Sequence, residues 1–505
     1  MKMESRYSKS VKNITFSFLS QLCIMLLSFI LPRLLISGFG SQVNGFFSTV
    51  NQLFSYLEIL RAGVGMAAIQ ALYKPITADD KDSISNILSS SKKYFDKLGF
   101  LYLAISFLIG VFFTLSNNTG LQRHEVFLIV IMQGVSGWIS FSKINWFVDL
   151  LRAEGKIYVY VIIQTIAKIF ILSLEIVAVY FTHNAVLVKS VALIFTVLQF
   201  LVITVYRRRN YYDYDFSRKQ NLSLLANRKS YLVFHISSMI CTNTDVVVVS
   251  VFCGYKIASV YSVYYLVVSG VNAILNTVYS GTSFILGHSY QEGIDAFKRT
   301  HDVYNLLYTT LTTCLFSICY ILLIPFICLY TKGISDINYI YKWLPCLFCL
   351  IQILSCGKNL GEITVNVGGL ADKVVWRSIL EASLNIIISL IMVQFIGIYG
   401  VLLGTVCALL YRLIDVIIFT NKHILKRSSR KCFKILIENI VLFILVVIVN
   451  EFINLNITSY LSFILWGLIF CVILFPAIFA VNLILNKDER LLIVLYLKKL
   501  FHRGQ

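Results

Sequence analysis

Long apolar runs, separated by short charged breaks, dominate this chain of 505 residues. About 20 consecutive apolar residues are enough for a helix to cross the hydrocarbon core of a bilayer. On this basis the sequence predicts fourteen transmembrane helices. Their expected ranges are 13–37, 43–72, 95–115, 126–150, 158–182, 185–205, 231–252, 259–287, 303–329, 341–367, 379–397, 400–420, 435–452 and 460–485. Because 58% of the residues are hydrophobic and 14% are charged, little chain is left for a soluble domain.

Basic residues predict the orientation of these helices. The chain carries 44 Lys and Arg against 25 Asp and Glu, a net charge of +19. With the N-terminus in the cytoplasm, thirty-two Lys and Arg fall in cytoplasmic segments and three outside, at Arg123, Lys256 and Lys332. Cytoplasmic loops are enriched in Lys and Arg, so we expect both termini to be cytoplasmic. The charge then indicates contact with anionic membrane lipids, and we expect no nucleic-acid partner.

An internal repeat predicts two lobes of six helices. At a shift of 214 residues, the segment 34–50 falls within 247–265, with Gly40 over Gly254 and Phe47 over Tyr261. At a shift of 215 residues, Lys143 falls on Lys358. Six helices separate the copies, so they would be parallel repeats. We expect an all-α polytopic membrane protein with an N-terminal lobe at 1–205 and a cytoplasmic connector at 206–230. A C-terminal lobe at 231–420 would follow, then two extra helices and a cytoplasmic tail at 421–505.

The segment 78–98, ADDKDSISNILSSSKKYFDKL, precedes the third predicted helix and has an amphipathic helical pattern. Such helices lie in the plane of the membrane interface with their apolar face in the lipid. We therefore expect this segment on the inner membrane surface, with a solvated loop as the alternative.

Ionisable side chains inside apolar helices are the first candidates for function, because each is costly in hydrocarbon. Three cations have an acid one turn away on the same helix and can form local ion pairs: Arg61 with Glu58, Lys358 with Glu362, and Arg412 with Asp415. Arg33, Lys143 and Lys168 have no such partner. An isolated cation at a helix centre costs about 2.5–3.5 kcal/mol. A water-filled cavity, acids from neighbouring helices or an anionic substrate must offset that cost.

For Lys143 and Lys168 we favour a cavity that admits an anion. Lys189 lies near a helix end, where its long side chain is expected to extend to the membrane interface. Helical positions of the first lobe have a net charge of +2 and those of the second a net charge of −1, which favours an anion in the first lobe. Asp245, alone in the segment NTDVVVVS, is the best candidate for a proton or coupling-ion site. Glu175 and Lys358 are further candidates for coupling or gating.

Enzyme signatures are absent from the sequence. It contains no Walker loop, no GxSxG, no HExxH and no carboxylate-rich loop of the kind that metal-dependent glycosyltransferases use. We therefore expect no catalytic residue, no metal site and no bound cofactor, and we expect the protein not to be an enzyme.

Several segments together resemble a known family. They are the end of the first helix, LPRLLIS, followed by ALYKPITADDKDSI, DLLRAEGKIYVYVIIQTI, TDVVVVSVFCGYKIASVYSVYYLV and EASLNIIISLIMVQFIGIYGVLLGT. These look like the polysaccharide export family, the bacterial flippases for lipid-linked oligosaccharides that include O-antigen and capsule repeat-unit flippases. That family belongs to the multidrug/oligosaccharidyl-lipid/polysaccharide exporter superfamily. The resemblance covers essentially the whole chain.

The resemblance implies a transporter of the bacterial cytoplasmic membrane. It would move a polyprenyl-pyrophosphate-linked oligosaccharide to the outer leaflet by alternating access between two six-helix lobes. Family members carry cations in a central cavity, and the matching residues here are Arg33, Arg61, Lys143 and Lys168. Coupling to H⁺ or Na⁺ and contact with polysaccharide polymerases or glycosyltransferases would be further properties. The alternatives are a multidrug or cation antiporter of the same superfamily, a membrane-bound polymerase or transferase, and a scaffold for an assembly complex.

Overall fold

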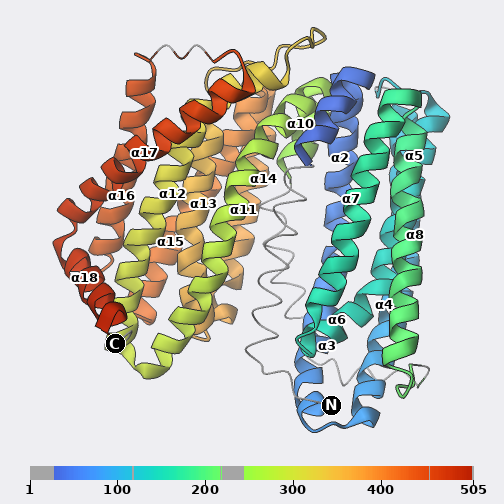
Figure 1. Ribbon diagram of the computed structural model, residues 1–505, viewed down its shortest axis with the longest axis horizontal. Helices are drawn as coiled ribbons and strands as arrows, with labels where there is room; N and C mark the ends of the chain where they lie inside the picture. The colour runs from blue at the N-terminus through green and yellow to red at the C-terminus, as the bar shows by residue number, and fades with distance from the viewer. Residues whose placement is uncertain are drawn as a thin grey trace. The chain divides into compact units, whose positions relative to one another are not determined.

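The described part of the chain contains helices and no strands, which confirms the predicted all-α polytopic fold (Figure 1). The computed structural model describes residues 28–116, 119–182, 184–216, 218, 244–453, 455 and 457–502, apart from some side chains within helices. Eleven helices in these ranges are long and apolar enough to cross a membrane. The beginning of the predicted helix 13–37, most of the predicted connector and the beginning of the predicted helix 231–252 lie outside the described residues.

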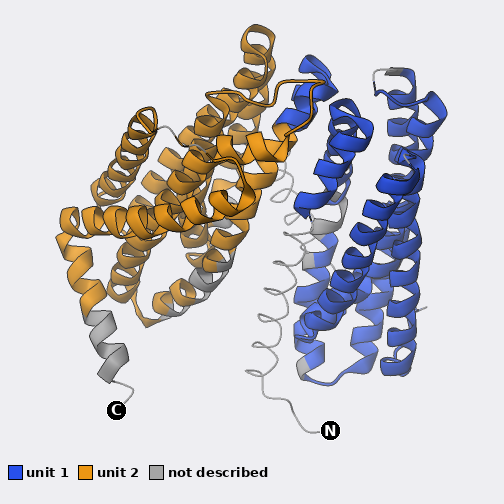
Figure 2. Ribbon diagram, turned by 45° about the horizontal axis from the view of Figure 1, so that its top comes forward, with its two compact units in different colours: residues 1–260 blue, residues 261–505 orange. Residues whose placement is uncertain are grey.

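The chain divides into two compact units, Met1–Val260 and Tyr261–Gln505 (Figure 2). The first, unit 1, contains the helix Ser28–Phe39, α2 (Ser41–Leu57), α3 (Ile59–Thr77), α4 (Lys81–Ser116), α5 (Arg123–Trp138), α6 (Asn145–Ala153), α7 (Ile157–Thr182), α8 (Ala185–Asn210) and α10 (Asp245–Cys253). A π-helical segment, Ile139–Ile144, joins α5 to α6, and the three form one span.

The second, unit 2, contains most of α11 (Tyr255–Glu292), then α12 (Ile294–Tyr330), α13 (Leu344–Val367), α14 (Val375–Ile396), α15 (Ile398–His423), α16 (Arg430–Asn450), α17 (Tyr460–Leu485) and α18 (Lys487–His502). α13 packs against α12 and α15, and α14 pairs with α15. Glycine permits the last contact, because a Cβ on Gly404 would lie 2.3 Å from the hydroxyl of Ser389. Close approach of helices at small residues is a common way to pack helices within membranes.

The amphipathic segment 78–98 is not a separate surface helix, so that expectation was wrong. α4 runs without a break from Lys81 to Ser116, about 54 Å at 1.5 Å per residue. Its polar first half is covered by the chain that follows α8. The amide of Asp215 donates to Ser85 Oγ (3.2 Å), and Ser89 Oγ donates to the carbonyl of Arg218 (2.6 Å). This part of the predicted connector therefore packs on unit 1.

Tyr211 anchors the beginning of the segment that follows α8 and covers α4. Its hydroxyl donates to Glu154 Oε2 at 2.6 Å, and its ring packs edge-on against Phe147. Burial, together with the Glu154 carboxylate, raises the pKa of Tyr211 well above its usual value. The phenol therefore remains protonated and keeps donating this hydrogen bond throughout the physiological pH range.

The predicted repeat is visible in backbone geometry at its two glycines. Gly40 has φ 86° and ψ 168°, and Gly254 has φ 85° and ψ 167°. Each precedes the first residue of a helix, Ser41 of α2 and Tyr255 of α11. Positive φ values of this kind favour glycine strongly, because a Cβ would be strained there. Glycine thus produces the same helix-to-helix turn at both positions of the repeat.

The first turns of α2 and α11 are in direct contact within unit 1. Asn44 Nδ2 donates to Ser259 Oγ at 2.8 Å, and both side chains are buried. A Cβ on Gly45 would lie only 1.7 Å from the carbonyl oxygen of Tyr255. No side chain larger than hydrogen fits at this position without separating the two helices.

We predict that Gly45→Ala destabilises the protein by about 1–3 kcal/mol, the usual cost of overpacking a tight contact. The clash is with backbone, which cannot rotate away as a flexible side chain would. The melting temperature of the purified chain in detergent, with the folded fraction from size-exclusion chromatography, would measure the effect. Gly287→Ala in α11 is the matched control, because a Cβ there meets nothing within 4 Å. Equal melting temperatures for the two variants would show that the contact is not this close.

Candidate functional site

Lys143 lies in the π-helical segment that joins α5 to α6. Its Nζ is 2.5 Å from Asp96 Oδ1 on α4, and the Ser142 hydroxyl donates to the same oxygen at 2.5 Å. The ammonium also lies 5.5 Å from the centre of the Trp138 ring. Short π-helical insertions in α-helices occur frequently at functional sites, because they change the direction of the side chains that follow.

Asp96 corrects the expectation that Lys143 faces a cavity without a carboxylate. The partner comes from a neighbouring helix, 47 positions earlier in the chain, so no pattern within one turn of Lys143 could reveal it. About a third of each side chain remains exposed, 35% for Lys143 and 29% for Asp96. A second anion can therefore reach the lysine without opening the core.

For Lys168, the expectation of a cavity that admits an anion stays a prediction. It lies in the middle of α7, where its side chain is exposed between apolar neighbours such as Ile166 and Ile169. In the described part of the chain, no carboxylate oxygen lies within 4 Å of its ammonium. Glu175, two turns later, is buried and points elsewhere. Lys168 thus carries an unneutralised charge on one of the most apolar helices of unit 1.

Glu175 and Lys189 belong to a polar cluster inside unit 1. The Lys189 ammonium lies 4.9 Å from the centre of the Phe47 ring, 3.4 Å from Asn51 Oδ1 and 3.5 Å from Gln133 Oε1, and it interacts electrostatically with Glu175. The expectation that Lys189 extends to the membrane interface was therefore wrong. A buried carboxylate on α7 and two amides hold the side chain inward.

The remaining predicted residues of unit 1 lie on three other helices. Arg33 is half-buried on the helix Ser28–Phe39, and Asp245 is the first residue of α10 and is buried. Arg61 is on α3, but its side chain is outside the described residues. Near it, a Cβ on Gly65 would lie 3.0 Å from the buried carboxylate of Asp149, so this glycine serves the close packing of α3 on α6.

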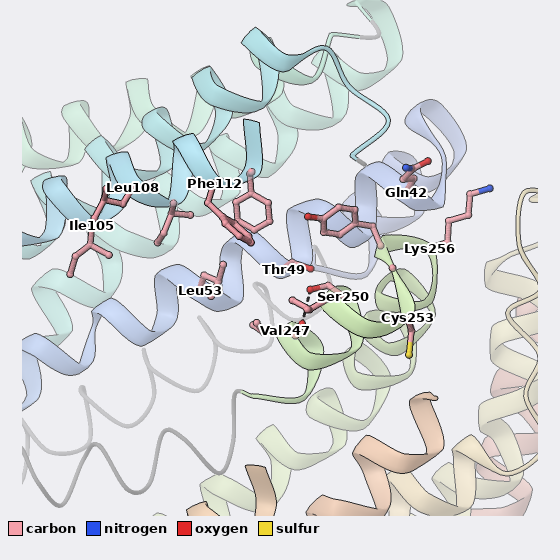
Figure 3. Close-up of a pocket in the computed structure, with 15 residues that line it drawn as sticks. Gln42, Thr49, Leu53, Ile105, Leu108, Phe112, Val247, Ser250, Cys253 and Lys256 are labelled. Carbon is pink, nitrogen blue, oxygen red and sulfur yellow. Dashed lines mark hydrogen bonds between the residues drawn. The ribbon is translucent and has the colours of Figure 1, made fainter. Parts of the chain in front are cut away.

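An apolar pocket of about 780 Å³ opens within unit 1 between α2, α4 and α10 (Figure 3). Leu53 of α2, Ile105 and Leu108 of α4 and Val247 of α10 contribute its apolar wall. Most of its lining is apolar, which suits a hydrocarbon chain, and its polar side chains include Gln42, Ser250 and Lys256. Sequence patterns could not reveal this pocket, because its walls come from helices far apart in the chain.

Lys358 occupies a different environment, in the interior of unit 2. Its ammonium is 3.0 Å from Glu381 Oε1 on α14 and 3.8 Å from Glu362 Oε1, one turn later on α13. The predicted pair of Lys358 with Glu362 is therefore present, and Glu381 completes it. Lys358 and Glu381 are both buried.

Arg412 of α15 extends the same network. The guanidinium, 1% exposed, lies 3.0 Å from Asp415 Oδ2, which confirms that predicted pair, and 3.5 Å from Glu381 Oε2. Asp415 also pairs with Arg377 of α14. Three cations and three carboxylates from three helices thus form one network whose formal charges balance. Lys358, Arg412 and Glu381 are buried in it, so each of these two cations already has a carboxylate partner inside the unit.

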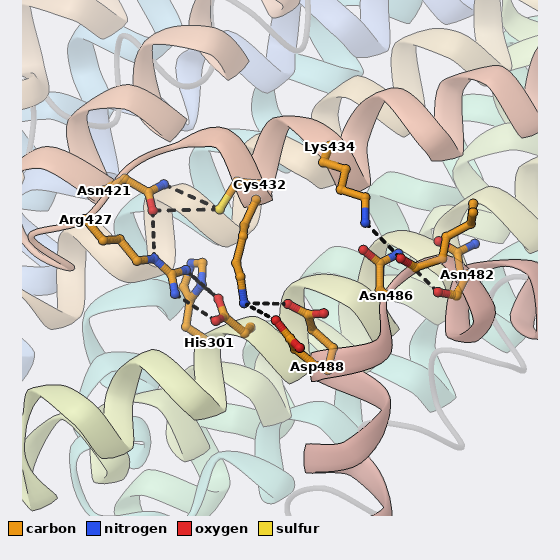
Figure 4. A network of polar contacts seen from close by, with 12 residues as sticks. His301, Asn421, Arg427, Cys432, Lys434, Asn482, Asn486 and Asp488 are labelled. Atoms are coloured by element: carbon orange, nitrogen blue, oxygen red, sulfur yellow. Dashed lines mark hydrogen bonds and ion pairs between the residues drawn. The ribbon is translucent and has the colours of Figure 1, made fainter.

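A second network ties the last helices to α12 (Figure 4). Arg427 forms a bidentate pair with Asp302, with one contact of 2.7 Å, and its Nε donates to Asn421 at 3.0 Å. Lys431 lies 3.3 Å from Asp488 and from Glu489. These contacts neutralise Arg427, in the α15–α16 connection, and Lys431, in the first turn of α16.

Comparison with known proteins gives the fold but no close relative. No family model and no curated protein matches the chain. Among solved structures, the lipid II flippase MurJ in an inward closed conformation is similar with TM-score 0.67 and 15% identity, covering 93% of this chain and 100% of that one. An inward-facing MATE multidrug resistance transporter of the MOP superfamily gives 0.65 and 16%, covering 81% and 99%.

A third similar structure is a MOP superfamily transporter from Pyrococcus furiosus, described as having a binding pocket of reverse polarity. Its TM-score is 0.58 at 15% identity, with 82% of this chain and 96% of that chain covered. Similarity at this level of identity shows the fold alone. The chain is therefore a multi-pass helical membrane protein with the fold shared by MATE and MurJ transporters.

We predict that Asp96 and Lys143 are energetically coupled. Either Asp96→Asn or Lys143→Gln should lower stability, because each leaves the opposite charge without its partner. The double variant should recover part of the loss, with a coupling energy of about 1–2 kcal/mol for a pair that is partly exposed. Melting temperatures of the four proteins in one detergent measure the cycle. Combining Asp96→Asn with Lys168→Gln is the control and should be additive; equal coupling in both cycles would contradict the pairing.

Proposed function

We propose that this protein moves a polyprenyl-pyrophosphate-linked oligosaccharide from the cytoplasmic to the outer leaflet of a bacterial cytoplasmic membrane, by alternating access. The observation that carries the proposal is Lys168, a cation without a carboxylate within 4 Å among the described residues, on an apolar helix of a fold shared with a lipid II flippase. The contrast with unit 2, where Lys358 and Arg412 are neutralised by buried acids, supports placing the anion in unit 1.

The chemistry of such a substrate fits these features. A pyrophosphate cannot cross hydrocarbon unaided, and a lysine in a low-dielectric setting offers it a strong electrostatic partner. The lipid chain can stay in the bilayer, and the apolar pocket of unit 1 could hold part of it. Binding would also remove the cost of about 2.5–3.5 kcal/mol that an isolated lysine at a helix centre carries.

The predicted residues then divide into two groups. Lys168 would contact the phosphates together with Arg33 and Arg61. Lys143 would join them by exchanging Asp96 for the substrate, which its partial exposure allows. Asp245, Glu175 and Lys358 would serve coupling to H⁺ or Na⁺ or the gating of access, and polymerases or glycosyltransferases would be the protein's partners. No step of this proposal requires enzyme activity or a bound cofactor.

We predict that Lys168→Ala and Lys143→Ala each abolish surface polysaccharide in cells that depend on this protein, at normal protein levels. Removing the cation leaves the pyrophosphate without its partner, so lipid-linked oligosaccharide should accumulate on the cytoplasmic side. Lys168→Arg should retain most export, because it keeps the charge. Immunoblots of membranes, and extraction of lipid-linked oligosaccharide, measure both quantities.

Lys422→Ala is the matched control, because this exposed lysine in the last turn of α15 lies outside the proposed path. It should export polysaccharide normally. Full export by both Lys143→Ala and Lys168→Ala would remove the assignment of these cations to the substrate.

A multidrug or cation antiporter is the second candidate. The similarity to the MATE transporter, at TM-score 0.65, is almost as high as the 0.67 for the flippase. A MATE-like function would require acids rather than cations as the important groups. Glu175→Gln and Asp245→Asn would then abolish drug resistance in a susceptible host, whereas Lys168→Ala would not.

A further inference from the structure

Arg207, in the last turn of α8, lies over two neighbouring aromatic rings. Its guanidinium carbon lies 5.3 Å from the centre of the Trp146 ring and 5.7 Å from that of Phe216, and the two rings are 5.1 Å apart. Trp146 comes from α6 and is 1% exposed, and Phe216 comes from the chain that returns over unit 1. Stacking on ring faces holds a guanidinium in place and leaves its N–H groups at the rim available for an acceptor.

Lys92 of α4 reaches the same indole. Its ammonium lies 5.8 Å from the centre of the Trp146 ring, and it interacts electrostatically with Arg207, Lys93 and Lys143. The one acid among its interactions is Asp96, which Lys143 already engages at 2.5 Å. Lys92 therefore lies near three other cations, and the nearby carboxylate of Asp96 is already paired with Lys143.

Among the residues that the structure describes, Arg207 and Lys92 are not engaged by an acceptor. Across the described ranges, no carboxylate oxygen lies within 4 Å of either group, and neither donates a hydrogen bond. Both side chains are half-buried, so water satisfies them only in part. Bringing like charges together in a partly desolvated place is unfavourable unless an anion lies between them.

We propose that Arg207 and Lys92 bind a phosphate group at this end of unit 1. Arg supplies a planar pair of N–H donors that matches two phosphate oxygens, and Lys adds a point charge. Arg208 and Arg209, exposed in the same turn, raise the local concentration of anions. The predicted topology places this end in the cytoplasm, where anionic lipid headgroups and soluble phosphates are both available. This goes beyond the proposed function, because the site does not include Lys168 and does not require transport.

The test measures phosphate binding by the full-length protein directly. Purified wild type and variants are titrated with dioleoyl-phosphatidylglycerol in detergent and bound lipid is counted by native mass spectrometry, with dioleoyl-phosphatidylcholine as the neutral-headgroup reference. A parallel arm measures thermal stabilisation by inorganic phosphate and pyrophosphate. We expect Arg207→Gln and Lys92→Gln each to weaken binding of the preferred probe about tenfold, which corresponds to about 1.4 kcal/mol.

Arg209→Gln is the matched control. It removes the same charge from the same turn but touches neither aromatic ring, so its affinity should stay within about twofold of wild type. Arg207→Lys keeps the charge but loses the paired donors, so its affinity should lie between those of wild type and Arg207→Gln. If Arg207→Gln does not fold, Arg207→Lys and Lys92→Gln still test the proposal.

The two arms identify the source of the phosphate. A loss confined to phosphatidylglycerol points to a lipid headgroup, and a loss confined to inorganic phosphate or pyrophosphate points to a soluble ligand; either supports the site. The proposal is overturned if Arg207→Gln and Lys92→Gln bind every probe as Arg209→Gln does. Because export and phosphate binding are measured separately, failure here leaves the flippase proposal standing, and the reverse also holds.

Discussion

The cost of placing charge among apolar helices governs this structure. In unit 2 this cost is offset by other side chains of the unit, because Lys358 and Arg412 share Glu381 and each has a further acid nearby. In unit 1 the cost is offset only in part. Lys143 is paired with Asp96, whereas Lys168 has no carboxylate within 4 Å among the described residues. A buried network with balanced charges resists anions, and an unbalanced set of cations attracts them. This difference in neutralisation is the physical basis for assigning an anionic substrate to unit 1.

Close packing at glycine determines where these charges can lie. Gly40 and Gly254 make the same turn before α2 and α11, and Gly45 lets the first turns of those helices touch. At Gly65, the absence of a side chain brings α3 against the buried carboxylate of Asp149. Polar groups of neighbouring helices can therefore meet inside the units, as Asn44 and Ser259 do, while the pocket beside α10 has a largely apolar wall.

The aromatic residues around α6 have a role that hydropathy alone does not suggest. Trp138 lies beside the Lys143 ammonium, and Trp146 beside Lys92 and Arg207. Along the chain, Trp138 directly precedes the π-helical segment and Trp146 follows it. An aromatic face stabilises a cation without neutralising it, so the positive charge stays available to an anion. In unit 1, Lys92 and Arg207 thus lie against an indole ring, whereas Lys358 and Arg412 of unit 2 lie against carboxylates.

Sequence alone determined the all-α polytopic fold, the matching glycines Gly40 and Gly254, and two ion pairs one turn apart, Lys358 with Glu362 and Arg412 with Asp415. Each follows from apolar runs, backbone preference or spacing along one helix. Only tertiary structure decided that Asp96 reaches Lys143, that Lys189 turns inward, and that the first half of α4 is covered by its own chain. Those contacts join side chains on different helices, whose relative rotation and depth depend on packing across the whole unit.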